Sequence, residues 1–349
     1  MKNKKDLGIG VIGIGMGTSL AMINDDPDSR LEVRGFAAPN AERVREACDQ
    51  AGVAFGTTDI DELVNRDDID VVGVFSPDQL HFEHCVAALN AGKHVICTKP
   101  LVTKAEDARA LAKLVTETGK VFVVGQTMRF DPPFVTAKRF FDDGDLGRTI
   151  VAEAHYVHDM RPVFEMTPWR ETAPQDFVFG GLCHPIDALR WFLGDVKRVQ
   201  AFGVRGGISN YPQEDNFLVN MEFVDGTIAR VLGTYGVVHQ PLTMYGLGLY
   251  GSSGSLVAGF GDYVGGEMRV VLDKLPGERE LKLEFEPETE GAYGHGQTLI
   301  KMLRHLEACI EGTEQPQPSV VDGAKTILVG DAIWRSIRSG GQLTDVESL

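Results

Sequence analysis

The chain has 349 residues, of which 43% are hydrophobic and 24% charged. That composition is typical of a globular protein, and the length predicts two domains. Its 50 acidic residues outnumber its 34 lysines and arginines, giving a net charge of −16. This balance argues against nucleic acid or an anionic membrane as the main partner. No stretch approaches the ~20 apolar residues that a membrane-spanning helix needs.

The five cysteines form no C-x-x-C pair and are odd in number. We therefore expect no disulfide framework and a reducing compartment, the cytoplasm. A basic N-terminus precedes an apolar run, but this run is glycine-rich, lacks a convincing cleavage site and is needed as the first strand. We expect no signal peptide.

A glycine-rich turn near the N-terminus is the first motif. The apolar run 7–12 predicts a parallel strand buried on both faces, and Gly13, Gly15 and Gly17 follow it before a helix expected from Thr18 onward. Glycines at such a junction let the backbone approach a pyrophosphate, whose charge lies at the helix N-terminus. Thr18 departs from the usual fingerprint, which has Gly or Ala there. The strand before and the helix after nevertheless favour a dinucleotide site.

Strands and helices alternate from this turn to residue 126. Strands are expected at 7–12, 31–37, 71–75, 94–97 and 121–124, with helices at 40–51, 60–63, 80–91 and 105–118 between them. This alternation predicts a doubly wound parallel sheet, an α/β domain over residues 1–126.

The pattern changes after residue 126. One more helix is expected at 134–141, and then segments alternate with a period of two at 150–157, 199–204, 216–223, 227–232, 244–250, 268–272 and 281–285. They predict a mostly antiparallel open sheet with one face covered, with helices at 184–193, 296–311 and 322–338 packed on it, and Asp225-Gly226 predicts a hairpin turn. Residues 127–349 would form this α+β domain for substrate binding and oligomerisation. The open face of so large a sheet predicts a homodimer or homotetramer.

Ligands of doubly wound sheets bind at the carboxyl ends of the strands. Three strand ends carry unusual residues: 76–81, 97–100 and 126–129. Lys99 precedes a proline, which disfavours helical backbone and would aim the amine into the crevice. A solvated surface lysine is the alternative at this point.

His184 is the second candidate. A glycine turn at 180–181 leads into an apolar helix in which His184 and Asp187 share one face. A histidine beside a carboxylate suits proton transfer near neutral pH, whereas a helix-capping histidine is the alternative. No H-E-x-x-H, C-x-x-C or acidic cluster with ligand spacing occurs, so no metal site is expected.

Together these motifs resemble one family. In order and spacing, Gly13-x-Gly15, Pro77-x-x-x-His81, 91–95 running into Lys99-Pro100, and 184–187 are similar to the Gfo/Idh/MocA oxidoreductases across nearly the whole chain. The resemblance implies an N-terminal Rossmann domain and hydride transfer between NAD or NADP and a hydroxyl or keto carbon. The implied substrate is a sugar, sugar acid or cyclitol.

The resemblance also implies roles for single residues. Lys99 would hydrogen-bond the reacting hydroxyl and relay its proton, and His184, aided by Asp187, would act as acid/base or orient the same oxygen. The resemblance implies cofactor contacts at Gly13, Gly15, Met16, Ser76, Pro77, His81, Thr98 and Lys99, and position in the glycine turn or at a strand end adds Gly17, Asn40, Arg43 and Gln126. Beside Lys99 and His184, substrate contacts are expected from position alone, at a strand end, in the strand 150–157, in the loop after it and before the helix 296–311: Arg129, Tyr156, His158, Trp169, Arg170 and Tyr293.

Three positions depart from the family pattern. Thr98 replaces a glutamate that helps to fix the nicotinamide ribose and the lysine, and Gly180 stands where many family dehydrogenases carry an aspartate. The end of the second strand, at Ala38, has no acid for the adenine ribose. Asn40 and Arg43 would accept a 2′-phosphate there, which favours NADP over NAD; alternatively, both simply cap and decorate the following helix.

Two other functions remain open. Some relatives hold NAD tightly and use a transient oxidation for net hydrolysis or epimerisation. Others bind a dinucleotide and sense metabolites without catalysis. The altered positions 98 and 180 permit this last reading, whereas the retention of both Lys99 and His184 favours the dehydrogenase.

Overall fold

The computed structural model describes residues 5–167, 175–209, 211–237, 242–261, 265–273, 280–287 and 296–349. The chain divides into two compact units. The first comprises Met1–Gln126 and Glu288–Ala324, and the second comprises Thr127–Pro287 and Lys325–Leu349. In the part of the chain that is described, no helix is long and apolar enough to cross a membrane.

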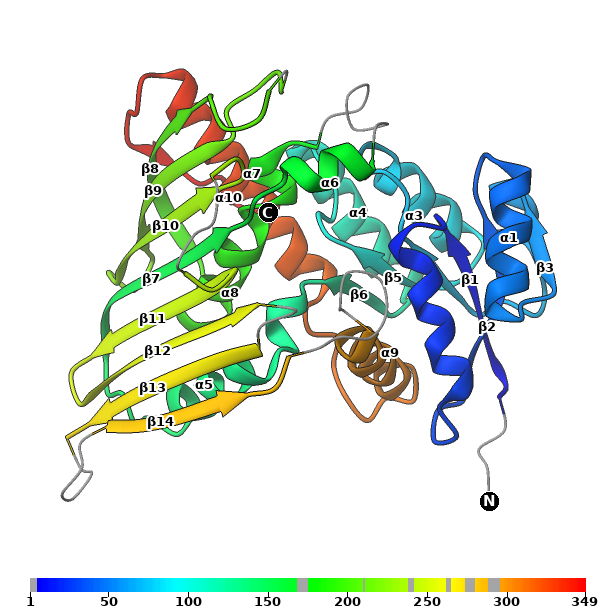
Figure 1. Ribbon diagram of the computed structural model, residues 1–349, viewed down its shortest axis with the longest axis horizontal. Helices are drawn as coiled ribbons and strands as arrows, with labels where there is room; N and C mark the ends of the chain where they lie inside the picture. The colour runs from blue at the N-terminus through cyan, green and yellow to red at the C-terminus, as the bar shows by residue number, and fades with distance from the viewer. Residues whose placement is uncertain are drawn as a thin grey trace. The chain divides into compact units, whose positions relative to one another are not determined.

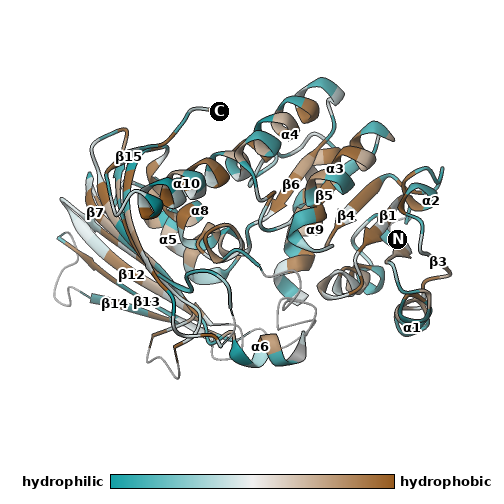
Figure 2. Ribbon diagram, turned by 90° about the horizontal axis from the view of Figure 1, so that it is seen from above, coloured by the Kyte–Doolittle hydropathy of each residue, from teal (hydrophilic) through white to brown (hydrophobic). Residues whose placement is uncertain are grey.

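The first unit is built on a six-stranded parallel sheet with the strand order β3-β2-β1-β4-β5-β6 (Figure 1). Every residue of β4 and β6 is buried, and Figure 2 shows β4, β5 and β6 as largely hydrophobic, as expected for strands covered on both faces. The strands are β1 (Leu7–Ile12), β2 (Leu31–Ala37), β3 (Phe55–Thr57), β4 (Val71–Val74), β5 (His94–Thr98) and β6 (Phe122–Gly125). This confirms the doubly wound sheet, and in such sheets ligands bind where the strand order reverses, which here is between β1 and β4.

Helices connect these strands. Asn40 caps α1 by accepting a hydrogen bond from the Arg43 amide, and Gly52 and Gly119 end α1 and α4 in left-handed backbone conformations. The helical elements are η1 (Met16–Asp25, of 3-10 type), α1 (Ala41–Ala51), α2 (Ile60–Val64), η2 (Asp78–Leu80, also 3-10), α3 (His81–Asn90) and α4 (Ala105–Thr118).

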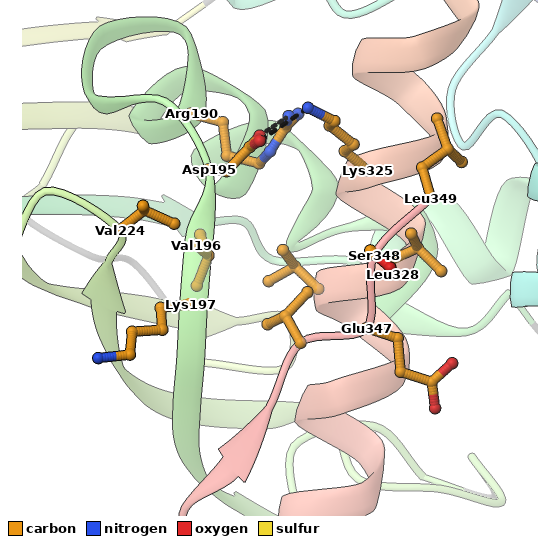
Figure 3. A pocket seen from close by; sticks show the side chains of 12 residues that line it. Arg190, Asp195, Val196, Lys197, Val224, Lys325, Leu328, Glu347, Ser348 and Leu349 are labelled. Carbon is orange, nitrogen blue, oxygen red and sulfur yellow. Dashed lines mark hydrogen bonds and ion pairs between the residues drawn. The ribbon is translucent and has the colours of Figure 1, made fainter.

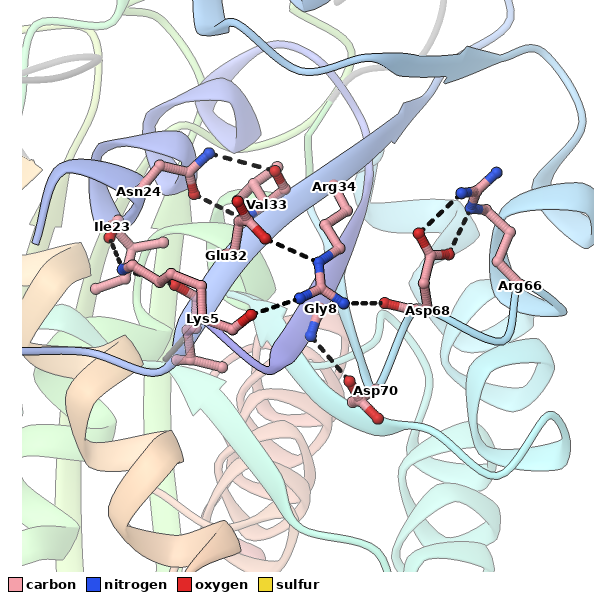
Figure 4. Close-up of polar contacts among 11 residues, drawn as sticks. Lys5, Gly8, Ile23, Asn24, Glu32, Val33, Arg34, Arg66, Asp68 and Asp70 are labelled. Carbon is pink, nitrogen blue, oxygen red and sulfur yellow. Dashed lines mark hydrogen bonds and ion pairs between the residues drawn. The ribbon is translucent and has the colours of Figure 1, made fainter. Parts of the chain in front are cut away.

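Polar contacts tie the amino ends of these strands together (Figure 4). The Gly8 amide donates to the Asp70 carboxylate at 2.8 Å, which joins β1 to the chain just before β4. The Asn24 side chain exchanges two hydrogen bonds with the main chain of Val33, which joins η1 to β2. These contacts lie at the end of the sheet opposite to the strand ends that carry the candidate site residues.

A late segment of the chain completes the first unit. In α9 (Gly296–Ile310), Arg304 forms a two-pronged ion pair with Asp26 at 2.7 Å, and Glu307 accepts from the Ser29 hydroxyl. Further along, the Val124 amide of β6 donates to the Pro318 carbonyl. The second domain therefore does not hold the whole of 127–349: these contacts hold 296–324 with the parallel sheet, and the division falls inside α10 (Val320–Arg338).

The second unit is built on a nine-stranded sheet with the order β14-β13-β12-β11-β7-β10-β9-β8-β15. Among the described strands of this second sheet, only β7 and β10 pair in parallel, which confirms a mostly antiparallel sheet. The strands are β7 (Thr149–Val157), β8 (Val196–Val204), β9 (Asn216–Phe223), β10 (Ile228–Thr234), β11 (Tyr245–Gly251), β12 (Gly254–Gly261), β13 (Gly265–Leu272), β14 (Glu280–Phe285) and β15 (Thr344–Asp345).

Helices cover one face of this sheet. The helix α8 packs against β7 and β11, α5 packs against β12 and β13, and the Trp334 ring of α10 meets Phe217 of β9 edge-on at 6.0 Å. The helical elements of this unit are η3 (Thr127–Arg129, of 3-10 type), α5 (Pro132–Asp142), α6 (Arg161–Met166), α7 (Phe177–Gly180), α8 (Cys183–Leu193) and most of α10. The turn at Asp225-Gly226 joins β9 to β10 as predicted, with Gly226 at φ +87°.

The sequence analysis missed several short or glycine-rich elements. The strand β3 has only three residues, and three glycines in β12 hide its alternation. The helix expected from Thr18 is of 3-10 type and begins at Met16. The short helices α6 and α7 and the two-residue strand β15 were not predicted either.

Candidate functional site

The three glycines after β1 have three different surroundings. Gly13 has φ +105°, and a Cβ atom there would overlap the Phe75 carbonyl, so the turn needs glycine at this position. A Cβ at Gly17 would lie 2.8 Å from Val11 and 3.0 Å from Phe75, so Gly17 allows η1 to pack closely on the sheet. A Cβ at Gly15 would meet nothing within 4 Å. The turn thus offers open backbone at Gly15, which fits an approaching pyrophosphate.

This arrangement explains the apparent departure at Thr18. The close-packing role of the third fingerprint glycine belongs to Gly17, one residue earlier than the sequence analysis looked for it. The Thr18 hydroxyl instead donates to the Gly15 carbonyl at 3.0 Å. Met16, the remaining predicted contact of the turn, is the first residue of η1.

The end of β2 carries the residues predicted at the adenine ribose. The side-chain oxygen Oδ1 of Asn40 caps α1 by accepting a hydrogen bond from the Arg43 main-chain amide, 3.0 Å away. The capping alternative for Asn40 is therefore present, but it occupies the side-chain oxygen and leaves the amide nitrogen for other contacts. Arg43 is exposed, and among the described residues its guanidinium has no ion-pair partner.

The loop after β4 is organised by two histidines of α3. His84 Nδ1 lies 2.8 Å from the Ser76 hydroxyl. His81 is completely buried, with Nε2 2.9 Å from the Ser76 carbonyl and Nδ1 2.6 Å from the Pro100 carbonyl. Because both ring nitrogens of His81 already contact main-chain oxygens, the predicted direct contact with a cofactor is not supported. Pro77, which leads into η2, lies in the loop that His81 holds.

Two neighbouring strand ends carry Thr98, Lys99 and Gln126. Thr98 is the last residue of β5 and is half-buried, as is Lys99 after it. Gln126 follows β6 and is 2% exposed, and its side-chain oxygen accepts no hydrogen bond from the described residues. A buried amide oxygen without a donor costs free energy, so this atom fits a group that binds at the strand ends.

His184 belongs to the second unit and lies among aromatic rings. It is the second residue of α8 and is 2% exposed. The Tyr156 ring meets it edge-on at 5.2 Å, and the Tyr245 ring lies 5.0 Å away. Tyr156 stacks on Tyr245 at 4.8 Å, and its hydroxyl is 3.0 Å from His158 Nδ1. The structure thus brings three predicted substrate contacts, Tyr156, His158 and His184, into one aromatic cluster. Tyr245 was missed.

Strand alternation separates these residues from another histidine. His155 precedes Tyr156 in β7 and therefore projects from the opposite face of the sheet, where a Cβ at Gly246 would overlap its ring. Burial lowers the pKa of His155, and its Nε2 is 3.0 Å from the Thr243 carbonyl.

Asp187 pairs with arginine rather than with histidine. Both of its oxygens accept from Arg129, each at 2.7 Å, and the two side chains are 1% and 5% exposed. The predicted His184–Asp187 pair is therefore replaced by an Arg129–Asp187 ion pair. Arg129 was expected to contact substrate, but a buried guanidinium that is bound by a carboxylate on two sides is already committed to a structural contact.

The space beside Gly180 is occupied by a neighbouring side chain. A Cβ there would overlap the side chain of Gln175, which is 8% exposed. An amide thus occupies the space from which the family's aspartate would extend. Asp176, which follows Gln175 in the sequence, caps α7 and accepts a hydrogen bond from the Trp334 indole.

Other predicted positions lie outside this description. Trp169, Arg170 and Tyr293 are not among the described residues. No group of three or more possible metal ligands occurs among the described residues.

A cavity elsewhere in the second unit contains none of the predicted site residues (Figure 3). Its volume is about 480 Å³, and its walls include the C-terminal residues 346–349. Asp195 accepts there from both Arg190, at 3.0 Å, and Lys325, at 2.7 Å. This carboxylate joins the end of α8 to α10, a structural role.

Comparisons with known proteins bear on the whole chain. The model of the oxidoreductase family with an NAD-binding Rossmann fold, Gfo/Idh/MocA, matches residues 7–126, and the model of the Gfo/Idh/MocA C-terminal domain matches residues 134–257. The 1,5-anhydro-D-fructose reductase of Ensifer adhaerens is 27% identical over 91% of this chain and 92% of its own length. The levoglucosan dehydrogenase of Pseudarthrobacter phenanthrenivorans is 27% identical over 95% of this chain and 96% of its own.

A solved structure agrees in fold. Levoglucosan dehydrogenase in complex with NADH and levoglucosan superimposes with a TM-score of 0.85 and 24% identity, covering 98% of this chain and all of that chain. The two family models match the chain one after the other in the two domains that the structure contains. The chain belongs to the Gfo/Idh/MocA family of oxidoreductases.

Proposed function

We propose that this protein transfers a hydride between NADP(H) and a hydroxyl or keto carbon of a sugar, sugar acid or cyclitol. The observation that carries the proposal is the turn after β1, where two glycines pack closely and the backbone of Gly15 stays open. The curated relatives are a reductase and a dehydrogenase of sugar derivatives, which supports this substrate class.

The cofactor would lie along the carboxyl ends of the parallel strands. Its pyrophosphate would be held by main-chain amides of the turn, from Gly13 to Gly17. The nicotinamide half would be bordered by Ser76, Pro77, Thr98 and Gln126. The side-chain oxygen of Gln126, which accepts no hydrogen bond from the described residues, could accept one from an amide N–H there. When bound, the nicotinamide supplies the hydride chemistry, which no amino-acid side chain provides.

The preference for NADP rests on the end of β2. Ala38, directly after β2, carries no carboxylate that would repel a 2′-phosphate, and Arg43 offers an exposed guanidinium without an ion-pair partner among the described residues. Arg43→Ala should weaken NADPH binding about tenfold or more and leave NADH binding nearly unchanged, because it removes one charge-assisted hydrogen bond. Arg45→Ala, at an exposed arginine two residues further along α1, is the matched control. Equal affinities of the unaltered protein for NADH and NADPH would contradict this preference.

Lys99 and His184 would handle the proton of the reacting hydroxyl. Lys99 would hydrogen-bond this oxygen and relay its proton, and His184 would orient the same oxygen or share the proton. The Tyr156 hydroxyl and His158 Nδ1, 3.0 Å apart, support a substrate rich in hydroxyl groups, because both can exchange hydrogen bonds with them. Asp187 would act through Arg129, as a positioning residue.

Turnover of NADPH and NADH with a panel that includes levoglucosan, 1,5-anhydro-D-fructose and myo-inositol tests the function. Lys99→Ala should lower kcat by about 100-fold or more, the usual range for general acid–base groups, while cofactor binding persists. Undiminished turnover in this variant would refute the role of Lys99. Cofactor that copurifies with the protein and supports net hydrolysis or epimerisation without added NAD(P) would favour transient oxidation, and tight binding without any turnover would favour a sensor.

We further propose that the protein assembles with itself through the open face of the nine-stranded sheet. Phe202, Leu218 and Ile228 project from this face and are 54%, 58% and 53% exposed, which is high for large apolar side chains. Leu218→Asp should therefore shift the sedimentation coefficient toward that of a monomer. The five buried thiols agree with a reducing compartment such as the cytoplasm.

A further inference from the structure

His81 has an unusual pair of hydrogen-bond partners. Its ring is fully buried at the start of α3, with Nδ1 2.6 Å from the Pro100 carbonyl and Nε2 2.9 Å from the Ser76 carbonyl. Both partners are carbonyl oxygens, which accept hydrogen bonds and donate none. A neutral imidazole carries one N–H and one lone pair, so it satisfies only one such partner. Two carbonyl partners require two N–H groups, which only the imidazolium form has.

The surroundings of the ring agree with a charged His81 beside a neutral His84. The titratable groups that face His81 are Asp78 from η2, Cys97 from β5 and, on its own helix, His84. Burial lowers the pKa of His81, but Cys97, Asp78 and the Pro100 carbonyl together raise it by more. The pKa of His81 is thereby raised to about 9. Burial and the charge of His81 both lower the pKa of His84, whose Nδ1 meets the Ser76 hydroxyl.

The two carbonyls that His81 joins belong to adjacent strand ends. Ser76 follows β4, Pro100 follows β5, and these strands pair in parallel register from Val71 and His94 onward. Lys99 directly precedes Pro100. A link between the two carbonyls therefore limits the backbone on the carboxyl side of Lys99 and in the loop through Pro77.

We propose that His81 is a positioning residue that is protonated at neutral pH, and that its two N–H groups clamp the loop after β4 to the Lys99-Pro100 turn. This inference rests on the proposed function, because it assigns a purpose to the geometry of two loops that would border the nicotinamide. The imidazolium fixes these loops before the cofactor arrives, so binding does not have to order them. His81 itself touches neither cofactor nor substrate.

The protonation state is tested on the unaltered protein without any ligand. In a nitrogen NMR spectrum of protein labelled in its histidine rings, His81 should show both ring nitrogens protonated at pH 7.5, above the ordinary histidine pKa. The signal is assigned by its loss in His81→Gln or, if that variant does not fold, by nuclear Overhauser contacts to Pro100 in the unaltered protein. A single protonated nitrogen at pH 7.5 would overturn the proposal.

The positioning role is tested by cofactor binding. His81→Gln keeps one amide donor, so it satisfies one carbonyl and leaves the other without a partner; its NADPH affinity should fall about tenfold. The control is His94→Gln, at the other end of β5, where the ring accepts from the Val121 amide and a glutamine oxygen also accepts. This control should bind NADPH within about twofold of the unaltered protein.

The pH profile distinguishes the clamp from simple packing. The NADPH affinity of the unaltered protein should fall as pH rises through about 9, with a slope that corresponds to the loss of one proton. This step should be missing in His81→Gln. Equal affinity or the same pH step in both proteins would refute the clamp. If the unaltered protein binds neither NADPH nor NADH, the proposed function fails, whereas the NMR result still decides the charge of His81.

Discussion

The ion pair between Arg129 and Asp187 allows the sharpest test of how the second unit is built. Its two hydrogen bonds are both 2.7 Å long, and the side chains are 5% and 1% exposed. Asp187→Asn keeps the shape of the side chain but removes its charge. The guanidinium of Arg129 is then left buried without its counter-ion.

Breaking a buried pair from one side is expensive. The stranded charge typically costs about 3–5 kcal/mol, because the arginine has lost water and gained no replacement for its carboxylate. We expect the free energy of unfolding to fall by about that amount in Asp187→Asn. Replacing both residues, as in Arg129→Met with Asp187→Leu, removes the stranded charge, so the double variant should be more stable than Asp187→Asn alone.

Urea unfolding followed by tryptophan fluorescence measures these differences, with Asp159→Asn as the control. Asp159 also binds an arginine, Arg161, through two hydrogen bonds, but that pair is partly exposed, at 38% and 27%, so its loss should be small. Equal effects of Asp187→Asn and Asp159→Asn would refute the reasoning from burial. The double variant also bears on function: if it recovers both stability and kcat, Asp187 acts only as the counter-ion of Arg129.

Three further predictions concern single positions. Gly17→Ala should lower the unfolding midpoint, because its Cβ meets Val11 at 2.8 Å, whereas Gly15→Ala should fold normally and bind dinucleotide more weakly; the opposite pattern would contradict the packing described for the turn. Tyr235→Phe should leave stability unchanged or raise it by about 1 kcal/mol, because this buried hydroxyl bonds to none of the described residues, and a clear loss of stability in urea would disprove that. Because the pKa of His81 is raised to about 9, its protonation should add up to ~3 kcal/mol to the free energy of unfolding. This contribution is complete below pH 6.5 and is lost as pH rises through 9, so the free energy of unfolding should depend less on pH in His81→Gln.

The parallel sheet could be predicted from the sequence because its signals are local. Buried strands such as β4 are short apolar runs, and Gly52 and Gly119 mark helix ends. The extent of the first unit could not be predicted in the same way. The contacts of Arg304 with Asp26 and of Glu307 with Ser29 each join residues 278 positions apart, and nothing local in α9 indicates which sheet it packs against.

In the candidate site, likewise, local signals could be predicted from the sequence and long-range contacts could not. Residue type and spacing predicted which groups stand at strand ends, such as Lys99 and Gln126, because position along a strand fixes where a side chain emerges. Spacing could not predict partners, because a side chain of the right length bonds to whatever the fold brings near. Asp187 shares a helix face with His184, three residues away, yet bonds to Arg129, 58 residues away. For the same reason a histidine expected to touch the cofactor instead holds two main-chain carbonyls. A motif therefore identifies the residues that matter more securely than it identifies what each one does, and the partner atoms decide the role.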